Sequence, residues 1–485
     1  MNARLLKTGL YLLIATSFLV TARNTYAQKY GNVWHFGDHA GIDFKTCSPE
    51  VISNSSMAGF EGCATVCDVN GNLLFYTNSD VVWNKFNNVM TNGNLISSSG
   101  TISQVLIVPK PGLQTEFYII TSKIQASGTL SLRYHIVDMT QNSGLGAVVS
   151  SNNVITTWNV TEQIAATTHA NGNDIWIMTH EYGTDKFLAF LLTPNGINLS
   201  PVISSVGPAH IPCTSNINSR GEIKFSPDCR RIAFNGNGVG SNSSSNILAL
   251  FDFDNSTGTV SNVINLPYSN GEFGLAFSPD NSKLYGSTWK AFAFGAGEYN
   301  YIYQFDLSSG IPSMIINSKV IIDSVPSINV FGSMKTGPDG RIYIARMNSG
   351  YLGVINEPNL SGLSCNYIAN GFYLGGNTST YGLNNYIEYQ NYCSPATGIY
   401  SLNTDESFSI VPNPVSDQVI INFSKDLIDA SLSIYSSAGV LMKRYYEFSG
   451  NKIQLDKQDL PPGIYFISVF DRNFKFENKK MIILE

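Results

Sequence analysis

The chain has 485 residues, a formal net charge of −6 and a sequence pI of about 5.6. Only 13% of its residues are charged and they form no basic cluster, so we expect no nucleic-acid partner, because nucleic acid is bound through concentrated positive charge. The chain has 42 glycines and 12% aromatic residues but no sustained helical periodicity, which together predict an all-β fold.

The N-terminus predicts a secretory signal peptide over residues 1–27. Arg4 and Lys7 precede an apolar run at 9–20, and small residues stand just before a cleavage site after Ala27. This apolar run is too short for a transmembrane helix. Cleavage removes three of the 29 basic groups and none of the 35 acidic groups, which leaves a formal charge of −9. No other long apolar run follows, so we expect no transmembrane segment in the mature chain.

Residues 28–395 contain an internal repeat of 52 residues. KFSPDCRRIAF at 224–234 and AFSPDNSKLYG at 276–286 share this offset, and so do FDFDNSTG at 251–258 and YQFDLSSG at 303–310. Weaker copies of the first marker occur at 68–77, 169–179 and 335–345. In each copy a turn built on Pro, Asp, Asn or Gly precedes a strand rich in β-branched or aromatic residues.

The length of the repeat predicts a β-propeller, because a blade of four short strands needs about this many residues. The FSPD-type turns resemble the WD40-like repeats of bacterial propellers. Residues 28–395 hold close to seven repeats, so we predict a seven-bladed β-propeller, with six or eight blades as alternatives. The opening segment at 33–44 is strand-like but has no turn marker. We expect it to close the ring by pairing into the last blade, near 353–358 or 372–376.

A linker-like segment at 396–407 precedes a C-terminal domain at 408–485. This domain begins with VPNP at 411–414, continues with alternating apolar residues at 419–423, and contains GIY at 463–465. Period-two alternation predicts short strands with one buried face, and hence a small Ig-like β-sandwich. The motifs resemble the type A C-terminal sorting domain of the type IX secretion system of Bacteroidetes. The resemblance implies export to the cell surface, the outer membrane or the extracellular space, with the type IX secretion machinery as a partner.

Segments of the first domain resemble an uncharacterised Bacteroidetes family of secreted propellers that carry the same sorting domain. The similar segments are WHFGDHAGIDF at 34–44, EGCATVCDVNGNLLFYTN at 61–78, VVWN at 81–84, VPKPG at 108–112 and LGVINEPN at 352–359. The resemblance implies an architecture and a destination, but no reaction.

Sequence motifs of known chemistry are absent. The chain has no nucleophile elbow, no HExxH, no CxxC and no phosphate-binding loop. Gly236, Gly238 and Gly240 lie in a polar run without the strand–helix transition of a nucleotide site, which favours a hairpin loop. FDFD at 251–254 places two acids on one face of a strand but lacks the further oxygen ligands of a calcium loop, so we interpret it as part of a turn.

The seven cysteines all lie in the propeller region, and an odd number leaves at least one thiol unpaired. Cys63 and Cys67 stand four residues apart on a predicted strand. At the rise of a strand they are roughly 13 Å apart, too far for a disulfide. Because exported proteins form disulfides, two pairs are candidates for oxidation. They are Cys213 with Cys229, and Cys365 with Cys393.

Candidate binding residues come from the histidines and acids, because propeller ligand sites gather around the central channel. The histidines are His35, His39, His135, His169, His180 and His210. His169 and His180 bracket one predicted strand, and Glu162 lies just upstream. Glu61 stands beside Gly62, where the backbone can be approached closely. These four residues are the binding candidates. Imidazole and carboxylate bind divalent metals, but no pair has a diagnostic spacing, so we predict no cofactor and keep a divalent metal as the alternative.

The sequence therefore favours a non-enzymatic, exported binding protein whose propeller presents a rigid face to a glycan, a peptide or a partner protein. The alternative is a propeller-type hydrolase or lactonase with a divalent metal bound in the channel. Acids and histidines that converge at the channel mouth would favour the enzyme, whereas a flat aromatic face would favour binding.

Overall fold

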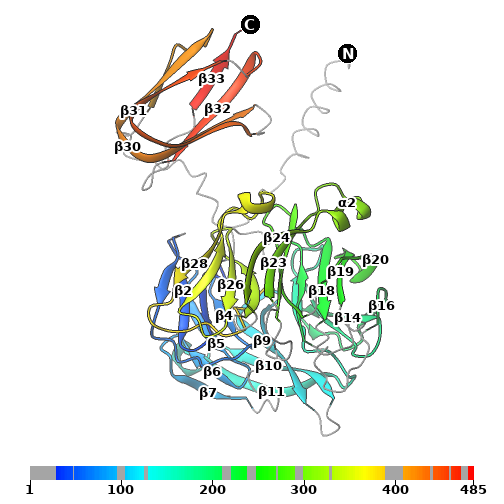
Figure 1. Cartoon of the computed structure of the whole chain (residues 1–485). Coiled ribbons are helices and arrows are strands. Elements are labelled where there is room, and N and C mark those ends of the chain that lie inside the picture. The colour runs from blue at the N-terminus through cyan, green and yellow to red at the C-terminus, as the bar shows by residue number, and fades with distance from the viewer. Residues whose placement is uncertain are drawn as a thin grey trace, which may run out of the picture. The chain divides into compact units, whose positions relative to one another are not determined.

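Strands form nearly all of the regular structure in the computed structural model of this protein (Figure 1), which confirms the predicted all-β fold. The structure describes residues 29–46, 48–95, 104–124, 129–209, 220–236, 247–268, 271–289, 299–326, 330–387, 408–436, 441–457, 460–470 and 479–484. The chain divides into two compact units, Met1–Pro395 and Ala396–Glu485.

Several predictions concern residues outside the described ranges and stay predictions. They are the signal peptide at 1–27, the glycine-rich loop that contains Gly238 and Gly240, His210, the linker at 396–407, and the disulfide partners Cys213 and Cys393.

The first unit is a β-propeller that begins with a three-stranded sheet. Its strands are β1 (Val33–Phe36), β2 (Ala40–Asp43) and β3 (Glu50–Ile52). Two meanders of four strands follow and share one sheet, because β7 and β11 meet in a parallel pair at Thr91 and Ala147. The first meander is β4 (Ala64–Cys67), β5 (Leu73–Thr77), β6 (Val81–Asn84) and β7 (Val89–Asn94). The second is β8 (Val105–Lys110), β9 (Leu113–Ile124), β10 (Leu130–Asp138) and β11 (Ala147–Thr156).

Four more antiparallel sheets complete the first unit. One contains β12 (Ala165–Thr168), β13 (Ile175–His180), β14 (Lys186–Thr193), β15 (Gly196–Ile197) and β16 (Val202–Ser205). The next contains β17 (Ile223–Phe225), β18 (Arg231–Gly236), β19 (Ile247–Asp254) and β20 (Thr259–Asn265). The third contains β21 (Glu272–Phe277), β22 (Lys283–Thr288), β23 (Tyr299–Asp306) and β24 (Val320–Pro326). The last contains β25 (Phe331–Thr336), β26 (Ile342–Arg346), β27 (Tyr351–Ile355) and β28 (Tyr367–Tyr373).

Among the described residues, helices are short. They are the 3-10 helix η2 (Asn142–Gly144), the α-helix α2 (Pro312–Asn317) and the 3-10 helix η6 (Gly362–Cys365). No described helix has the length and apolar character needed to cross a bilayer.

The first strands of successive meanders contact one another, in the order β1, β4, β8, β12, β17, β21 and β25. The described part of the first unit therefore holds seven successive meanders, if the three-stranded sheet is included. A blade number of seven stays a prediction, because that first sheet is smaller than a full blade.

The repeated FSPD turns have the same construction in both copies. Ser226 Oγ donates a hydrogen bond to Asp228 Oδ1 at 2.6 Å. The same Ser226 Oγ accepts a hydrogen bond from the Arg231 N–H at 2.9 Å. In the next copy Ser278 Oγ bonds Asp280 Oδ1 at 2.7 Å in the same way. A short polar side chain that forms hydrogen bonds within its own turn fixes the conformation of the turn. The turn then sets the register in which the second strand of the sheet begins.

The ring closes through residues that follow β28. Thr378 pairs with Asp38, whose N–H donates to the Thr378 carbonyl at 2.9 Å. Ser379 pairs on its other side with Ser349, in the turn before β27. One short stretch of backbone thus joins the first sheet to the last, and Figure 1 shows β2 and β28 next to each other.

The opening segment closes the ring next to the second of the two predicted places, because Asp38 bridges Thr378, two residues past 372–376. The alternative at 353–358 is wrong. β27 is already paired on both sides, with β26 and with β28, so it has no free edge for the opening segment. The opening strands β1, β2 and β3 form a sheet of their own within the described residues.

Residues 377–387, which we call the central segment, then enter the middle of the ring. The Tyr381 N–H donates to the Phe60 carbonyl at 2.9 Å, and the Tyr381 carbonyl accepts from the Ser333 N–H at 2.7 Å. The Asn384 side chain accepts a hydrogen bond from the Thr65 N–H at 2.6 Å. The central segment is therefore bonded to β4 and to β25 at once.

The far end of the central segment reaches other sheets. Asn385 Nδ2 donates to the Ile164 carbonyl at 3.1 Å, just before β12. Tyr386 forms a parallel bridge with Ile107 of β8. Ile387 is buried among the apolar residues of the sheets that contain β8 and β12. The chain thus fills its own channel.

The second unit is a separate β-structure. Its strands are β29 (Phe408–Val411), β30 (Gln418–Ser436), β31 (Leu441–Asp456), β32 (Gly463–Phe470) and β33 (Lys479–Ile483). The long strand β30 pairs with β29, β31 and β32, and β32 also pairs with β33. Val419, Ile421 and Phe423 of β30 alternate along the strand and are buried in its core, in agreement with the period-two pattern. An Ig-like topology stays a prediction.

We predict that Gly382 is essential for the closed ring. A Cβ atom at this position would lie 1.6 Å from the carbonyl oxygen of Glu61, which belongs to the backbone and cannot rotate away. Gly382→Ala should therefore destabilise the first unit by at least about 1–3 kcal/mol. The measurement is chemical denaturation of the purified protein, followed by circular dichroism.

The matched control is Gly350→Ala, because a Cβ atom there meets nothing nearer than 3.9 Å. This variant should unfold within about 1 kcal/mol of the unsubstituted protein. Equal stabilities of the two variants would show that the central segment does not hold the ring closed.

Candidate functional site

Buried polar side chains stand at the beginning of the innermost strands. Five of them are Glu61, Gln104, Gln163, Glu222 and Glu272. Glu272 accepts a hydrogen bond from the Tyr303 hydroxyl within its own sheet. The other four stand at neighbouring inner strands, which contact one another, and so gather at one end of the central channel. We call Glu61, Gln104, Glu162, Gln163, Arg220, Glu222 and Lys224 the channel cluster.

Amide side chains connect neighbouring sheets within this cluster. Gln104 donates from Nε2 to the Gly221 carbonyl at 2.7 Å and accepts at Oε1 from the Ile164 N–H at 3.3 Å. Gln163 donates from Nε2 to the Asn235 carbonyl at 2.8 Å. An amide side chain can donate and accept at the same time, which suits it to join two strands that do not pair directly.

Glu222 combines an ion pair with a backbone contact. Its Oε2 accepts a hydrogen bond from the Leu275 N–H of the next sheet at 2.7 Å. Its Oε1 lies 3.1 Å from Lys224 Nζ, and both side chains are buried. A buried carboxylate with a cation and an N–H as partners recovers much of its desolvation cost, so this part of the cluster is structural.

Glu61 and Glu162 are different, because within the described residues they share a single cation, Arg220. Burial is the main reason why the pKa of Glu61 lies well above its usual range. The charge of Glu162 raises this pKa further, and Arg220 lowers it. Burial also raises the pKa of Glu162 to about 8, although Arg220 Nε lies 3.9 Å from Glu162 Oε1. The pair therefore retains a proton at neutral pH, as expected of two acids that are buried near each other.

Only the two acids among the four predicted site residues take part in this cluster. His169 lies in an exposed turn, where Nε2 donates to the Ser256 carbonyl at 3.1 Å and Nδ1 accepts from the Asn171 N–H at 2.9 Å. His180 is buried beside Phe234, with ring centres 4.9 Å apart, and burial lowers its pKa to about 3. Neither histidine has a charged or polar contact to Glu61 or Glu162 among the interactions described.

The other described histidines also have structural surroundings. His35 is stacked on Tyr76 with ring centres 4.1 Å apart, and burial lowers its pKa to about 3. His39 bonds the Ser55 carbonyl through Nδ1 at 2.7 Å. His135 accepts at Nδ1 from the Asn152 N–H at 3.2 Å. Across the described ranges, no three His, Cys, Asp or Glu side chains form a group that could hold a metal ion.

The FDFD acids and the described cysteines have no ligand geometry. Asp254 accepts hydrogen bonds from the Ser256 N–H at 2.9 Å and from Thr257 Oγ1 at 2.9 Å, which supports its interpretation as a turn residue. Cys63 and Cys67 are buried free thiols. Burial raises the pKa of each to about 12, so neither is a thiolate at neutral pH.

Aromatic rings cover the channel cluster. We call Phe60, Phe273, Trp289, Tyr381 and Arg220 the mouth cluster. Tyr381 contacts both Phe60, at 4.7 Å between ring centres, and Trp289, at 5.6 Å. The Arg220 guanidinium lies 5.7 Å from the centre of the Trp289 ring. Phe60 is 42% exposed, while Trp289 and Tyr381 are buried. Arg220 therefore connects an accessible aromatic surface to the buried acids.

The space beneath this surface is small. A cavity of about 10 Å³ is lined by residues that include Glu61, Glu222, Lys224 and Asn385. This volume holds about one water molecule. Among the described residues, a cavity of this size has no room for a substrate-sized molecule beside the central segment.

Sequence reasoning missed most of the channel cluster, including Gln104, Arg220, Glu222 and Lys224. The sequence does contain a pattern that could have indicated the buried acids. An acid stands next to glycine just before an innermost strand in three sheets. The three pairs are Glu61–Gly62, Gly221–Glu222 and Gly271–Glu272. Because the pairs do not follow the 52-residue offset of the FSPD turns, they are not visible as part of the repeat.

Comparison with protein families identifies the second unit. Residues 409–484 match the model of the secretion system C-terminal sorting domain. The protein therefore carries a type IX sorting domain and is exported to the cell surface or outside the cell. The search of curated proteins gave no match.

Among solved structures, the first unit has distant propeller-like neighbours. The β-propeller domain of the trilobed protease from Pyrococcus furiosus is 8% identical, with 67% of this chain and 81% of that chain covered and a TM-score of 0.29. A protein of unknown function from Bacteroides caccae is 10% identical, with 67% and 96% covered and a TM-score of 0.34. A gluconolactonase from Xanthomonas campestris is 14% identical, with 56% and 83% covered and a TM-score of 0.29. No activity follows from likenesses this distant.

We predict that the Glu162 carboxyl makes stability depend on pH. Its pKa is about 8 in the folded chain against an ordinary 4.5, so the folded state binds more protons between these values. The free energy of unfolding should thus fall as pH rises from about 4.5 to about 8, by at most about 1.4 kcal/mol per pH unit for one proton. Glu162→Gln should flatten this slope, which denaturant titrations at several pH values would measure.

The control for this prediction is Glu357→Gln, a change of the same kind at an exposed position. It should keep the slope of the unsubstituted protein. A slope in Glu162→Gln as steep as that of the control would mean that Glu162 is ionised in the folded state throughout this range.

Proposed function

We propose that this protein is a non-enzymatic binding protein of a Bacteroidetes bacterium. An N-terminal signal peptide takes it into the periplasm, and the sorting domain hands it to the type IX secretion machinery. The match of residues 409–484 to the sorting domain supports this route. The WD40-like propeller is then the part that meets a ligand at the cell surface or outside the cell.

The observation that carries the binding role is the mouth cluster. Phe60 offers an accessible ring, and Arg220 offers N–H donors beside Trp289, where both Phe60 and Trp289 contact Tyr381. Aromatic and arginine side chains dominate the energetics of many protein binding sites, since they combine large contact area with hydrogen bonding. A ligand for this surface has an apolar face for Phe60 and a hydrogen-bond acceptor for Arg220, as many glycans and peptides do.

The filled channel supports surface binding over catalysis inside the ring. Because the central segment bonds to β4, to β25 and to Ile164 just before β12, the axis is occupied by the protein itself. A rigid face assembled from several sheets loses little conformational entropy when a ligand is bound.

We predict that ligands found by screening depend on the mouth cluster. The probes are immobilised neutral and uronate-containing oligosaccharides, together with peptides that end in a free carboxylate. Binding of any hit should weaken about tenfold or more in Phe60→Ala and in Arg220→Ala, which corresponds to a loss of at least about 1.4 kcal/mol for each contact. Surface plasmon resonance on the exported protein would measure the dissociation constants.

The matched control is Phe86→Ala. Phe86 is 63% exposed and lies with Lys85 Nζ 5.4 Å from its ring centre, so it too is an accessible ring beside a cation. It stands in the turn between β6 and β7, at the opposite end of its sheet. Hits that are weakened by Phe86→Ala and not by the mouth variants would refute the assignment of the binding face.

A second candidate function is a hydrolase or lactonase, favoured by the raised pKa values of Glu61 and Glu162. A carboxyl that remains protonated at neutral pH can act as a general acid. In this alternative a divalent metal would bind in the channel.

The binding proposal predicts that calcium, zinc and manganese leave the melting temperature unchanged. A site that bound one of these ions would stabilise the folded state by mass action. Thermal unfolding with micromolar metal measures the effect. An increase of several degrees that is lost in the double variant Glu61→Gln, Glu162→Gln, together with hydrolysis of a lactone substrate, would favour the enzyme instead.

A further inference from the structure

A second cavity lies on the outer rim of the propeller, away from the inner strands. It has a volume of about 370 Å³, within the range of small-ligand sites, and it is lined by six residues. They are Ile322, Asp323, Leu363, Asn366, Tyr367 and Ala369. β24 and β28, which supply four of them, are the outermost strands of two neighbouring sheets, and η6 supplies Leu363. We call this cavity the rim groove.

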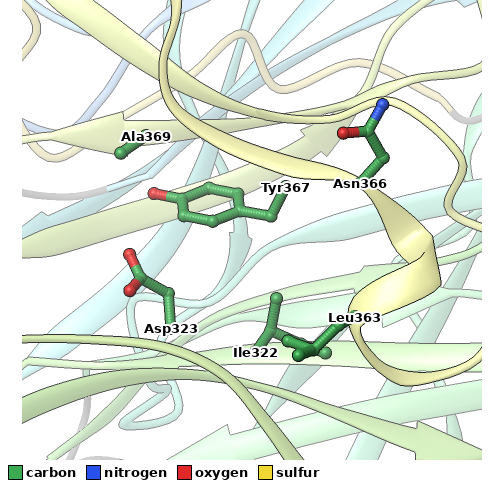
Figure 2. Close-up of a pocket in the computed structure, with 6 residues that line it drawn as sticks. All are labelled: Ile322, Asp323, Leu363, Asn366, Tyr367 and Ala369. Carbon is green, nitrogen blue, oxygen red and sulfur yellow. The ribbon is translucent and has the colours of Figure 1, made fainter. Parts of the chain in front are cut away.

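Polar groups without protein partners face the rim groove. The Tyr367 hydroxyl is buried and has no hydrogen-bond partner among the described residues. Asp323 is half-buried, and no ion pair or hydrogen bond of its carboxylate is found within the described part of the chain. Figure 2 shows the Tyr367 hydroxyl and the Asp323 carboxylate at the same end of the groove. An unpaired buried hydroxyl costs free energy, which a ligand with matching groups would recover.

Asp323 is the acidic side chain in the lining of the groove. Arg346 lies beside the groove, where it donates to the carbonyl of the lining residue Ala369 at 2.7 Å and to the Asn370 side chain at 2.6 Å. Its described hydrogen bonds do not include Asp323, so the Asp323 carboxylate has no direct cationic partner among the residues that the structure describes. Burial is the main cause that raises the pKa of Tyr367, and the negative charge of Asp323 adds to it, so the hydroxyl stays protonated.

The rest of the lining is suited to a carbon chain. Ile322 is buried at the base of the groove, and Leu363 is 74% exposed on η6. Figure 2 places Ile322 and Leu363 next to each other, away from the Asp323 carboxylate. Exposure of a side chain as large as Leu363 beside a cavity is expected where a partner covers it.

We propose that the rim groove binds a primary ammonium group on an aliphatic stem, as in the lysine side chain of a peptide or partner protein. An ammonium has three N–H donors and no acceptor. The Asp323 carboxylate and the Tyr367 hydroxyl oxygen are two acceptors at the same end of this cavity, and the third N–H would face solvent. The methylene groups of lysine would lie against Ile322 and Leu363. This site is independent of the mouth cluster and does not rest on the function proposed for it.

The experiment uses Nα-acetyl-lysine methylamide as the probe and the full exported chain. Methyl resonances of Ile322 and Leu363 report on binding. We expect saturable shifts of these resonances at millimolar probe, and a response to salt, because a charge pair contributes. The matched probe Nα-acetyl-norleucine methylamide keeps the carbon chain but has no ammonium, and it should bind at least about tenfold more weakly.

Variants identify the groups involved. Asp323→Asn should weaken binding of the lysine probe at least tenfold, a difference of about 1.4 kcal/mol, and Tyr367→Phe should weaken it several-fold. Glu50→Gln removes the same charge from the outermost strand β3 of another sheet and should leave the affinity unchanged. Circular dichroism confirms that each variant is folded.

Several outcomes would overturn the proposal. Equal affinity for the lysine and norleucine probes would show that the groove recognises only apolar surface. Equal weakening by Asp323→Asn and Glu50→Gln would show a non-specific charge effect. Tighter binding of glucose than of the lysine probe would make the groove a saccharide site, and an absence of saturable shifts would mean that it is not a ligand site.

Discussion

The propeller depends on one constraint, which is that the inner edges of its sheets need hydrogen-bond partners. A strand at the edge of a sheet exposes N–H and C=O groups, and a narrow channel gives water little access to them. This chain supplies the partners from its own central segment. The Asn384 side chain accepts from the Thr65 N–H, and the Asn385 side chain donates to the Ile164 carbonyl. The central segment thus closes the ring and fills its axis with the same residues.

A filled axis explains the chemistry of the channel cluster. Since water is largely excluded, each charge there needs a specific partner or a proton. Glu222 has Lys224 and the Leu275 N–H. Glu61 and Glu162 have Arg220 as their one described cationic partner, and burial keeps a proton on the pair. A raised pKa at such a place follows from desolvation in a closed structure and does not by itself indicate catalysis.

The sequence predicted the features that are encoded locally. Ser226 and Asp228 form their turn with atoms a few residues apart, so the turn repeats visibly with each sheet. The central segment has no such local signal, because its asparagines and glycines make contacts with residues far along the chain. Prediction of the candidate site was limited in the same way, because its contacts also join residues far apart in the sequence. His169 and His180 were chosen for their chemistry and proved to have local structural roles, whereas Arg220 could be connected with Glu162 only after folding.

The closing contacts also limit the order in which the fold can form. Thr65 bonds Asn384 across 319 positions of sequence, and Thr380 bonds the Gly59 carbonyl across 321. Contacts so distant carry a large loop-closure cost until the intervening sheets have formed, so they are made late in folding. The same segment bonds the Phe60 carbonyl and lies against Glu61, with no room for a Cβ at Gly382. The last contacts to form therefore also fix the mouth and channel clusters, so the geometry of the candidate site exists only in the fully closed ring.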